Sequence, residues 1–331
     1  MRTRVTELLG IEAPVTQGAM AYIADARLAA AVSEAGGLGI IAAGGLTPDQ
    51  LAEQVKIARQ LTNKPLGVNI MMMDPHAADI ARMVCSLSID VVTTGAGSPA
   101  AYIAQWKEAG VKVIPVVASA ALAKRMERLG ADAVIAEGTE AGGHIGELTT
   151  MALIPACVRE TTIPVIAAGG IADGRGMLAA FALGAEGVQC GTRFLTVEEC
   201  KVCDAWKQMV IDAKDSDTIV TGRRTGHPVR GLKNKFAREC RVIENASDSE
   251  KELEGMFRGS LRRAVLEGDV EGGSVMAGQI AAIVHERKTA REALWEMVAE
   301  CENVAACTLA ELVELNERRD FNMKKKEAGD E

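Results

Sequence analysis

Eight short apolar runs recur along the first 190 residues, and each is followed by a segment with the pattern of a helix. Each run has the length of a strand buried on both faces of a parallel sheet. In the helix-like segment 118–129, Leu122, Met126 and Leu129 share one face. The runs are residues 13–17, 37–42, 65–71, 90–94, 111–117, 133–136, 164–168 and 187–190. This repeat predicts a (β/α)8 TIM barrel of the α/β class rather than an open doubly wound sheet.

The repeat ends well before the chain does. We expect residues 1–195 to form the barrel, and the polar, charge-rich residues 196–273 to form a smaller domain inserted after strand eight. Apolar helical character returns at residues 274–284 and 289–298. We therefore expect residues 274–331 to supply the last helices of the barrel and a charged tail that frays at its end.

Composition excludes several classes of protein. The net charge of −8 argues against nucleic-acid binding. No window approaches 18 consecutive apolar residues, so we expect no membrane segment and a cytoplasmic protein. The eight cysteines are scattered, and the Cys200–Cys203 pair has no second pair to complete a zinc site. We expect no metal ligands and read the cysteines as small buried residues.

Glycine-rich segments follow most of the predicted strands, where a barrel of this kind places its site. Gly169-Gly170 after strand seven and Gly191-Thr192 after strand eight occupy the usual phosphate position, where free N–H groups and a helix N-terminus meet an anion. A helix terminus contributes about 0.3–2 kcal/mol, whereas micromolar affinity needs roughly 8 kcal/mol. The ligand therefore needs a flat or apolar body besides its phosphate.

Two phosphorylated cofactors suit such a barrel, flavin mononucleotide (FMN) and pyridoxal phosphate. The chain has no G-x-G-x-x-G and no P-loop motif. Pyridoxal chemistry requires a lysine at the barrel mouth, and no predicted strand ends in one, since Lys112 lies at the start of strand five. The sequence favours FMN.

His144, one of four histidines, follows Gly142 and Gly143 in the loop after strand six. We interpret these glycines as allowing the backbone to lie against a flat ring, with His144 reaching its open face. An imidazole donates or accepts a proton near neutral pH. The alternative is a loop histidine that only caps the next helix.

At these residues the sequence resembles the enoyl-acyl carrier protein reductase II family of flavin-dependent bacterial enzymes, which are related to the nitronate monooxygenases (2-nitropropane dioxygenases). Segments such as "EAGGHIG" and "AAGGIADG" are common to both groups, whereas "GDVEGGSVMAGQIA" resembles the reductases. The resemblance runs from about Arg2 to Val284 and implies bound FMN and NADH or NADPH as reductant. It also implies hydride transfer from flavin N5 to the β-carbon of a trans-2-enoyl thioester in fatty acid synthesis.

The resemblance also assigns roles to individual residues. His144 orients the substrate or assists protonation of its α-carbon. The phosphate meets Gly169, Gly170, Gly191 and Thr192; the ring and ribityl chain meet Gly18, Met20, Asn69, Glu137 and Gly142; Met276 and Gln279 approach from a segment that closes the mouth. Family members respond to monovalent cations, but the sequence shows no ligand set for one.

A basic stretch lies within the otherwise acidic chain. Arg223, Arg224, Arg230, Lys233 and Lys235 belong to it. A solvated face is one interpretation. The other is an electrostatic site for the acidic acyl carrier protein.

Other functions fit parts of the same pattern. A nitronate monooxygenase uses the same flavin and histidine but passes electrons to oxygen. An inosine-monophosphate dehydrogenase type of enzyme needs a cysteine after strand six, and residues 137–152 contain none. A flavin-storing protein would bind FMN without turnover. The apolar C-terminal helices fit either burial within one chain or a homodimer interface.

Overall fold

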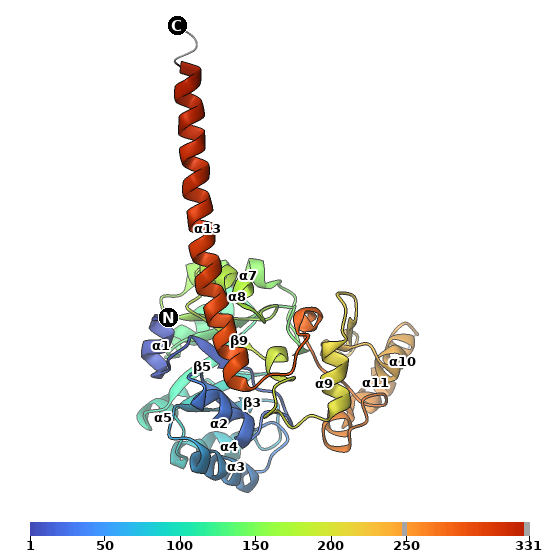
Figure 1. Cartoon of the computed structure of the whole chain (residues 1–331). Coiled ribbons are helices and arrows are strands. Elements are labelled where there is room, and N and C mark those ends of the chain that lie inside the picture. The colour runs from blue at the N-terminus through green and yellow to red at the C-terminus, as the bar shows by residue number, and fades with distance from the viewer. Residues whose placement is uncertain (247–249, 328–331) are drawn as a thin grey trace.

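The computed structural model describes the backbone of residues 1–246 and 250–327, and the side chains of residues 1–246 and 250–308. Its main sheet has eight strands, all parallel, in the order β1-β9-β8-β6-β5-β4-β3-β2 (Figure 1). The sheet closes where Leu38, just before β2, bonds through its N–H to Val15 O at 3.0 Å and through its carbonyl to Gln17 N at 2.9 Å. The predicted TIM barrel is confirmed.

Each predicted strand run matches an observed barrel strand to within two residues at either end. The strands are β1 (Val15–Gln17), β2 (Gly39–Ala42), β3 (Leu66–Met71), β4 (Val91–Gly95), β5 (Lys112–Val117), β6 (Val134–Glu137), β8 (Val165–Ala168) and β9 (Gly187–Cys190). The helical elements up to the end of the barrel strands are α1 (Arg4–Leu9), α2 (Ala26–Glu34), α3 (Pro48–Leu61), α4 (Ala77–Met83), η1 (Val84–Ser86), α5 (Ile103–Glu108), α6 (Ala120–Arg128), α7 (Thr150–Glu160), α8 (Gly174–Ala182) and η2 (Thr192–Phe194).

Apolar side chains pack both in the interior of the barrel and between its strands and the surrounding helices. One buried cluster combines strand residues such as Ile40, Ile114 and Ile166 with Val5 and Leu9 of α1, so α1 covers the end where the strands begin. Two further clusters lie between the strands and the surrounding helices. With one end covered by α1, the opposite end, where the strands finish, is left for the site.

A lobe follows the last barrel strand and stands beside the barrel (Figure 1). It contains α9 (Asp204–Ile211), β10 (Thr218–Thr221), β11 (Val229–Leu232), α10 (Lys235–Glu244), α11 (Glu250–Phe257), α12 (Ser260–Arg262) and the π-helical turn η3 (Arg263–Glu267). Trp206 and Val210 of α9 pack in the barrel's outer cluster, whereas Phe236, Cys240 and Leu253 form a small cluster of their own. The lobe is thus joined to the barrel through α9.

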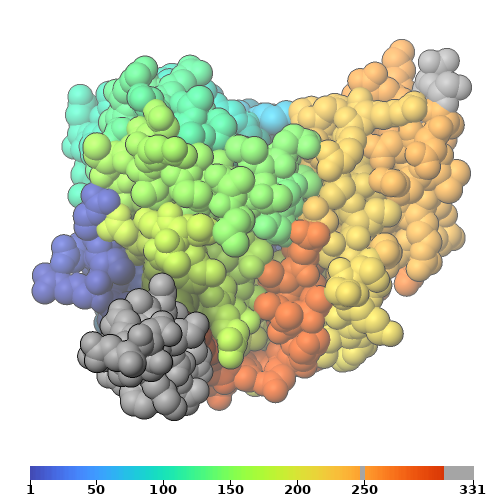
Figure 2. All heavy atoms as spheres, turned by 90° about the horizontal axis from the view of Figure 1, so that it is seen from above, coloured from blue at the N-terminus to red at the C-terminus, as the bar shows by residue number. Residues whose placement is uncertain are grey.

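Residues 274–284 do not form the helix that their composition predicts. Met276 forms a bridge to Gly231, and a short 3-10 helix η4 (Gln279–Ile283) follows. Figure 2 shows this part of the chain, in orange, between barrel residues in green and lobe residues in yellow. The segment is held by hydrogen bonds to loops of the barrel, described below, which take the place of helical ones.

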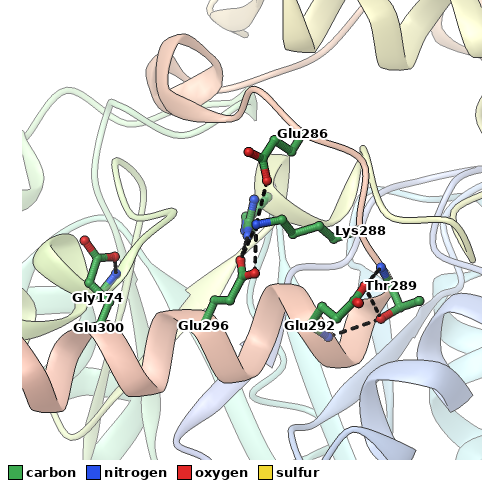
Figure 3. Close-up of polar contacts among 8 residues, drawn as sticks. Gly174, Glu286, Lys288, Thr289, Glu292, Glu296 and Glu300 are labelled. Carbon is green, nitrogen blue, oxygen red and sulfur yellow. Dashed lines mark hydrogen bonds and ion pairs between the residues drawn. The ribbon is translucent and has the colours of Figure 1, made fainter.

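The last element, α13 (Ala290–Glu327), is 38 residues long and packs first against α8 before it runs away from the barrel (Figure 1). Glu296 pairs with Arg193 and Lys288, and Glu300 accepts a hydrogen bond from Gly174 N at 2.7 Å (Figure 3). A Cβ on Gly174 would lie 2.3 Å from Cys301 N, so a glycine is required at this contact. The expected charged tail is helical to Glu327, and residues 328–331 lie outside the described part of the chain. No described helix has the length and apolarity to cross a membrane.

Candidate active site at the barrel mouth

The glycines after β8 and β9 lie side by side, because the two strands pair in parallel with Ala168 opposite Gln189. Gly169 and Gly170 have φ angles of +88° and +74°, which glycine adopts without strain. In the part of the chain that the structure describes, the N–H groups of Gly169, Gly170 and Gly191 donate to no protein acceptor. This cluster of free donors suits the phosphate of the expected cofactor.

The N-terminus of α8 is not available to a phosphate. Asp173 accepts a hydrogen bond from Gly176 N at 2.7 Å, and Glu300 of α13 accepts from Gly174 N at 2.7 Å (Figure 3). Two carboxylates therefore already occupy this helix end. We therefore expect an anion at the mouth to meet the loop donors after β8 and β9 rather than this helix end.

Gly18 and Met20, predicted to contact the ring and ribityl chain, lie beside the phosphate loops. Gly18 N donates to Cys190 O at 2.8 Å, and a Cβ on Gly18 would lie 3.3 Å from Gly191 Cα. The Met20 sulfur lies 3.8 Å from the position of a Cβ on Gly191. The end of β1 and the end of β9 thus form one continuous surface.

Two polar side chains stand at the ends of other strands. The Asn69 side-chain nitrogen donates to the Thr93 hydroxyl at 2.9 Å, which fixes the orientation of its amide. Glu137, the last residue of β6, is partly exposed yet surrounded by protein, and this desolvation raises its pKa to about 7. A carboxyl group of this kind both donates and accepts hydrogen bonds at neutral pH.

His144 lies on a short strand, β7 (Gly143–His144), where the sequence predicts a loop. β7 pairs with β11 of the lobe, with His144 opposite Val229, and the following Ile145 N donates to Pro228 O at 3.1 Å. The His144 side chain is exposed at one side, yet desolvation by the surrounding protein lowers its pKa, and the charge of His227 lowers it further. The lobe therefore fixes the position of His144 and affects its protonation.

The segment with Met276 and Gln279 closes over the loop after β6. Gln279 N donates to Glu140 O at 3.0 Å, and Gly278 N donates to the buried hydroxyl of Thr192 at 2.9 Å. The Met276 sulfur lies 3.6 Å from where a Cβ on Gly143 would stand. This closing segment, residues 275–279, joins the loops after β6 and β9.

Gly142 has a structural role that its sequence context does not show. A Cβ at Gly142 would lie 2.6 Å from Ala277 C and 2.7 Å from Gly278 N. Close packing of the closing segment is thus sufficient to exclude a side chain here.

Glu140 and Thr150 are site residues that the sequence reasoning missed. A Glu140 carboxylate oxygen accepts from Thr150 N at 2.8 Å and from the Thr150 hydroxyl at 2.7 Å, and that hydroxyl also lies 2.8 Å from Gly169 O. Together they hold the loop after β6 against the loop after β8. Their contacts are tertiary, so no local sequence signal reveals them.

The basic stretch divides into buried and exposed cations. Arg230 is only 8% exposed; it donates to Thr139 O at 3.2 Å and to the Thr218 hydroxyl at 3.1 Å, so its place in an exposed patch is wrong. Its position on β11, opposite Gly143, accounts for this burial. Arg223 is exposed and pairs with Glu147 at 2.9 Å. Arg224, Lys233 and Lys235 are also exposed.

The described residues contain no cluster of three or more His, Cys, Asp or Glu side chains arranged for a metal ion. All eight cysteines are free: five are buried, Cys85 and Cys203 are partly buried, and Cys307 is exposed. Reading every cysteine as buried is therefore wrong for Cys307, which lies on α13 beyond its contact with α8.

Comparison with known proteins agrees with this architecture. A family model described as nitronate monooxygenase matches residues 2–87 and 80–300. FabK from Thermotoga maritima is 50% identical with a TM-score of 0.92, over 94% of this chain and 99% of that one. Nitroalkane oxidase from Streptomyces ansochromogenes is 29% identical with a TM-score of 0.82, over 92% and 99% of the two chains.

A further relative acts on a different compound. It is (3aS,4S,5R,7aS)-5-hydroxy-7a-methyl-1-oxo-octahydro-1H-indene-4-carboxyl-CoA dehydrogenase of Mycobacterium tuberculosis, 34% identical over 338 residues, which cover 90% of this chain and 95% of that protein. The chain therefore belongs to the nitronate monooxygenase family of flavin-dependent oxidoreductases.

Proposed function

We propose that the protein is an FMN-dependent enoyl-acyl carrier protein reductase that uses NADH or NADPH to reduce the trans-2 double bond of an enoyl thioester. The observation that carries the proposal is the 50% identity, over 94% of the chain, to FabK, which is an enoyl-acyl carrier protein reductase II. The arrangement of the mouth supports it: free N–H donors for a phosphate, a carboxyl group with a pKa of about 7, and a histidine in the loop after β6 that is held in place by β11 of the lobe.

The residues at the mouth fit FMN. The N–H groups of Gly169, Gly170 and Gly191 would hold its phosphate. Thr192 would hold the loop after β9 in place, because its hydroxyl accepts a hydrogen bond from Gly278 N. Glu137 would hydrogen-bond the edge of the ring system. When bound, FMN supplies the redox chemistry of a hydride carrier.

His144 would orient the thioester and protonate its α-carbon when the β-carbon takes a hydride. A lowered pKa makes the protonated form of His144 a stronger acid, so the imidazolium would give up its proton more readily to the α-carbon. The closing segment would cover one side of this position, since it packs directly on the loop that carries His144.

The exposed cations Arg223, Arg224, Lys233 and Lys235 would capture the acidic carrier protein. They belong to a chain with a net charge of −8, so the local positive field would favour one docking orientation. Replacing Arg223 and Arg224 by glutamine is expected to raise KM for the carrier-protein substrate and flatten its salt dependence, with the KM for enoyl-CoA unchanged. An unaltered salt dependence would contradict this role.

A second candidate is oxidation of an alkyl nitronate with O2. The match to the nitronate monooxygenase family model and the likeness to nitroalkane oxidase favour it. The same histidine would then orient the nitronate, and electrons would pass to oxygen.

Anaerobic stopped-flow absorbance distinguishes the two candidates. We expect NADH or NADPH to bleach the flavin band, and an enoyl thioester to restore it without oxygen. A band restored only by oxygen, together with bleaching by a nitronate, would establish the monooxygenase instead. A protein that cannot be loaded with FMN would overturn both.

A further inference from the structure

The first turns of α13 bond to the chain just beyond both loops that we assign to the cofactor phosphate. Glu296 and Glu300 are four residues apart, so their carboxylates lie on the same face of this helix (Figure 3). Glu300 accepts a hydrogen bond from Gly174 N at 2.7 Å, and Glu296 pairs with Arg193 at 3.3 Å. Gly174 begins α8 after the loop that follows β8, and Arg193 lies two residues after Gly191. One helix thus connects two loops that are separate in sequence.

Arg193 is a buried cation held from α13. The residue is only 9% exposed, and its Nε has no hydrogen-bond partner in the described part of the chain. Within residues 1–246 and 250–308, Glu296 is the only group that bonds its side chain. Arg193 also belongs to the single 3-10 turn η2, in which Phe194 N donates to Gly191 O at 2.9 Å. Holding the Arg193 side chain therefore also holds the backbone of Gly191.

The contact of Glu300 acts in the same way on the loop after β8. Ile171 and Ala172, which lie between Gly170 and Gly174, are both buried, so this short piece of backbone has little freedom. Gly174 also packs tightly on α13, where a Cβ on this glycine would lie 2.5 Å from the Glu300 Cβ. A change in the position of Gly174 would therefore be passed to the N–H of Gly170.

The helix that carries the two carboxylates is itself fixed on the barrel. Trp295 Nε1 donates to Ala35 O, at the end of α2, at 2.8 Å, and Leu294 is fully buried. Lys288 Nζ bonds both carboxylate oxygens of Glu296, at 2.8 and 2.7 Å (Figure 3). These contacts set the orientation of the Glu296 carboxylate toward Arg193.

We propose that Glu296 and Glu300 are positioning residues for the phosphate of FMN, and that they act through Arg193 and Gly174 on the loops after β9 and β8. This inference rests on the part of the proposed function that assigns FMN to the mouth, and it does not depend on the substrate. Riboflavin differs from FMN only in lacking the phosphate. The two carboxylates should therefore affect the affinity for FMN and leave the affinity for riboflavin unchanged.

The first test uses paired variants that separate the contact from the charge. Glu300→Gln and Glu300→Ala both remove the negative charge, but only glutamine keeps an oxygen that can accept from Gly174 N. In the full-length protein stripped of flavin, we expect the Kd for FMN, measured by flavin fluorescence, to be roughly tenfold higher for the alanine variant than for the glutamine variant. The Kd for riboflavin should be equal in the two. Glu302→Ala, an exposed change on the same helix, is the matched control and should bind both flavins as wild type does.

A second pair, Glu296→Gln and Glu296→Ala, tests the contact with Arg193 independently. The alanine variant should again bind FMN more weakly than the glutamine variant, with riboflavin unaffected. Equal Kd values for FMN within a pair would overturn the role of that carboxylate. Equal losses of FMN and riboflavin affinity would also overturn it, because they would show a general loss of structure.

The wild-type protein offers a test that needs no substitution. If α13 holds the phosphate loops, a bound phosphate must in turn stabilise the docking of α13. We therefore expect FMN, but not riboflavin, to slow amide hydrogen exchange in residues 290–301. Equal exchange with the two flavins would overturn the link between helix and loops. A wild-type protein that binds FMN no more tightly than riboflavin would instead overturn the assignment of FMN, before any variant is compared.

Discussion

Replacing Glu137 by glutamine should stabilise the protein, and the gain should grow with pH. The folded protein raises the pKa of this carboxyl from its ordinary value of 4.5 to about 7. Between these values the folded state binds more protons than the unfolded state, so wild-type stability falls as pH rises through this window. Glutamine has a similar shape and does not ionise, so the variant lacks this loss.

The size of the effect follows from the two pKa values. The gap between about 7 and 4.5 corresponds to a loss of about 3 kcal/mol once the carboxyl is ionised in both states. Most of this loss develops between pH 5 and pH 8. For a chain of 331 residues, whose unfolding entropy is about 0.7 kcal/mol/K, it corresponds to a difference in Tm of roughly 4 °C.

Scanning calorimetry of the FMN-free wild type and Glu137→Gln at pH 5 and pH 8 measures this difference. We expect nearly equal Tm values at pH 5 and a higher value for the variant at pH 8. Glu108→Gln, an exposed change at the end of α5, is the matched control and should follow wild type at both pH values. A difference between Glu137→Gln and wild type that does not change with pH would refute the reasoning.

Three further substitutions test the packing of the site, each by its urea midpoint at pH 7. Gly142→Ala places a methyl group 2.6 Å from Ala277 C and should cost about 1–3 kcal/mol, with FMN affinity lowered; an unchanged midpoint would contradict the packing of the closing segment. Thr192→Val removes the acceptor of Gly278 N and should cost about 1–3 kcal/mol; a variant as stable as wild type would show that the bond contributes little. Gly255→Ala, exposed within α11 with open space around it, should stabilise by about 0.5–1 kcal/mol, and destabilisation would show a contact that the helix does not reveal.

The barrel strands were predictable because burial on both faces leaves a continuous apolar run. Val134–Glu137 and Val165–Ala168, for example, lie within one residue of the predicted runs. The grouping of the glycines that follow the strands was also predictable. In a TIM barrel the loops after all eight strands lie at the same end, whatever their sequence. A residue that directly follows a predicted strand could therefore be placed at the barrel mouth from the sequence alone.

Features set by distant partners were not predictable. Gly143 and His144 become a strand only because β11 lies beside them. Residues 274–284 are apolar like a buried helix, but their N–H groups bond to Glu140 and Thr192 across the mouth, which favours an extended chain at Gly278. Arg230 looks like the exposed cations near it in sequence, and only the register of β11 buries it. In each case the deciding contact joins residues far apart in sequence.

The position of α13 at the end of the chain determines how the protein is assembled on the ribosome. The contacts of α8 with Glu300 and Cys301 need residues synthesised more than a hundred positions after β9, at a delay on the order of ten seconds. During that delay the outer face of α8 is uncovered while the whole lobe is synthesised. The packing of α8 is therefore completed only after the lobe has been synthesised, and a nascent chain stalled before Ala290 leaves that face of α8 open for chaperones to bind.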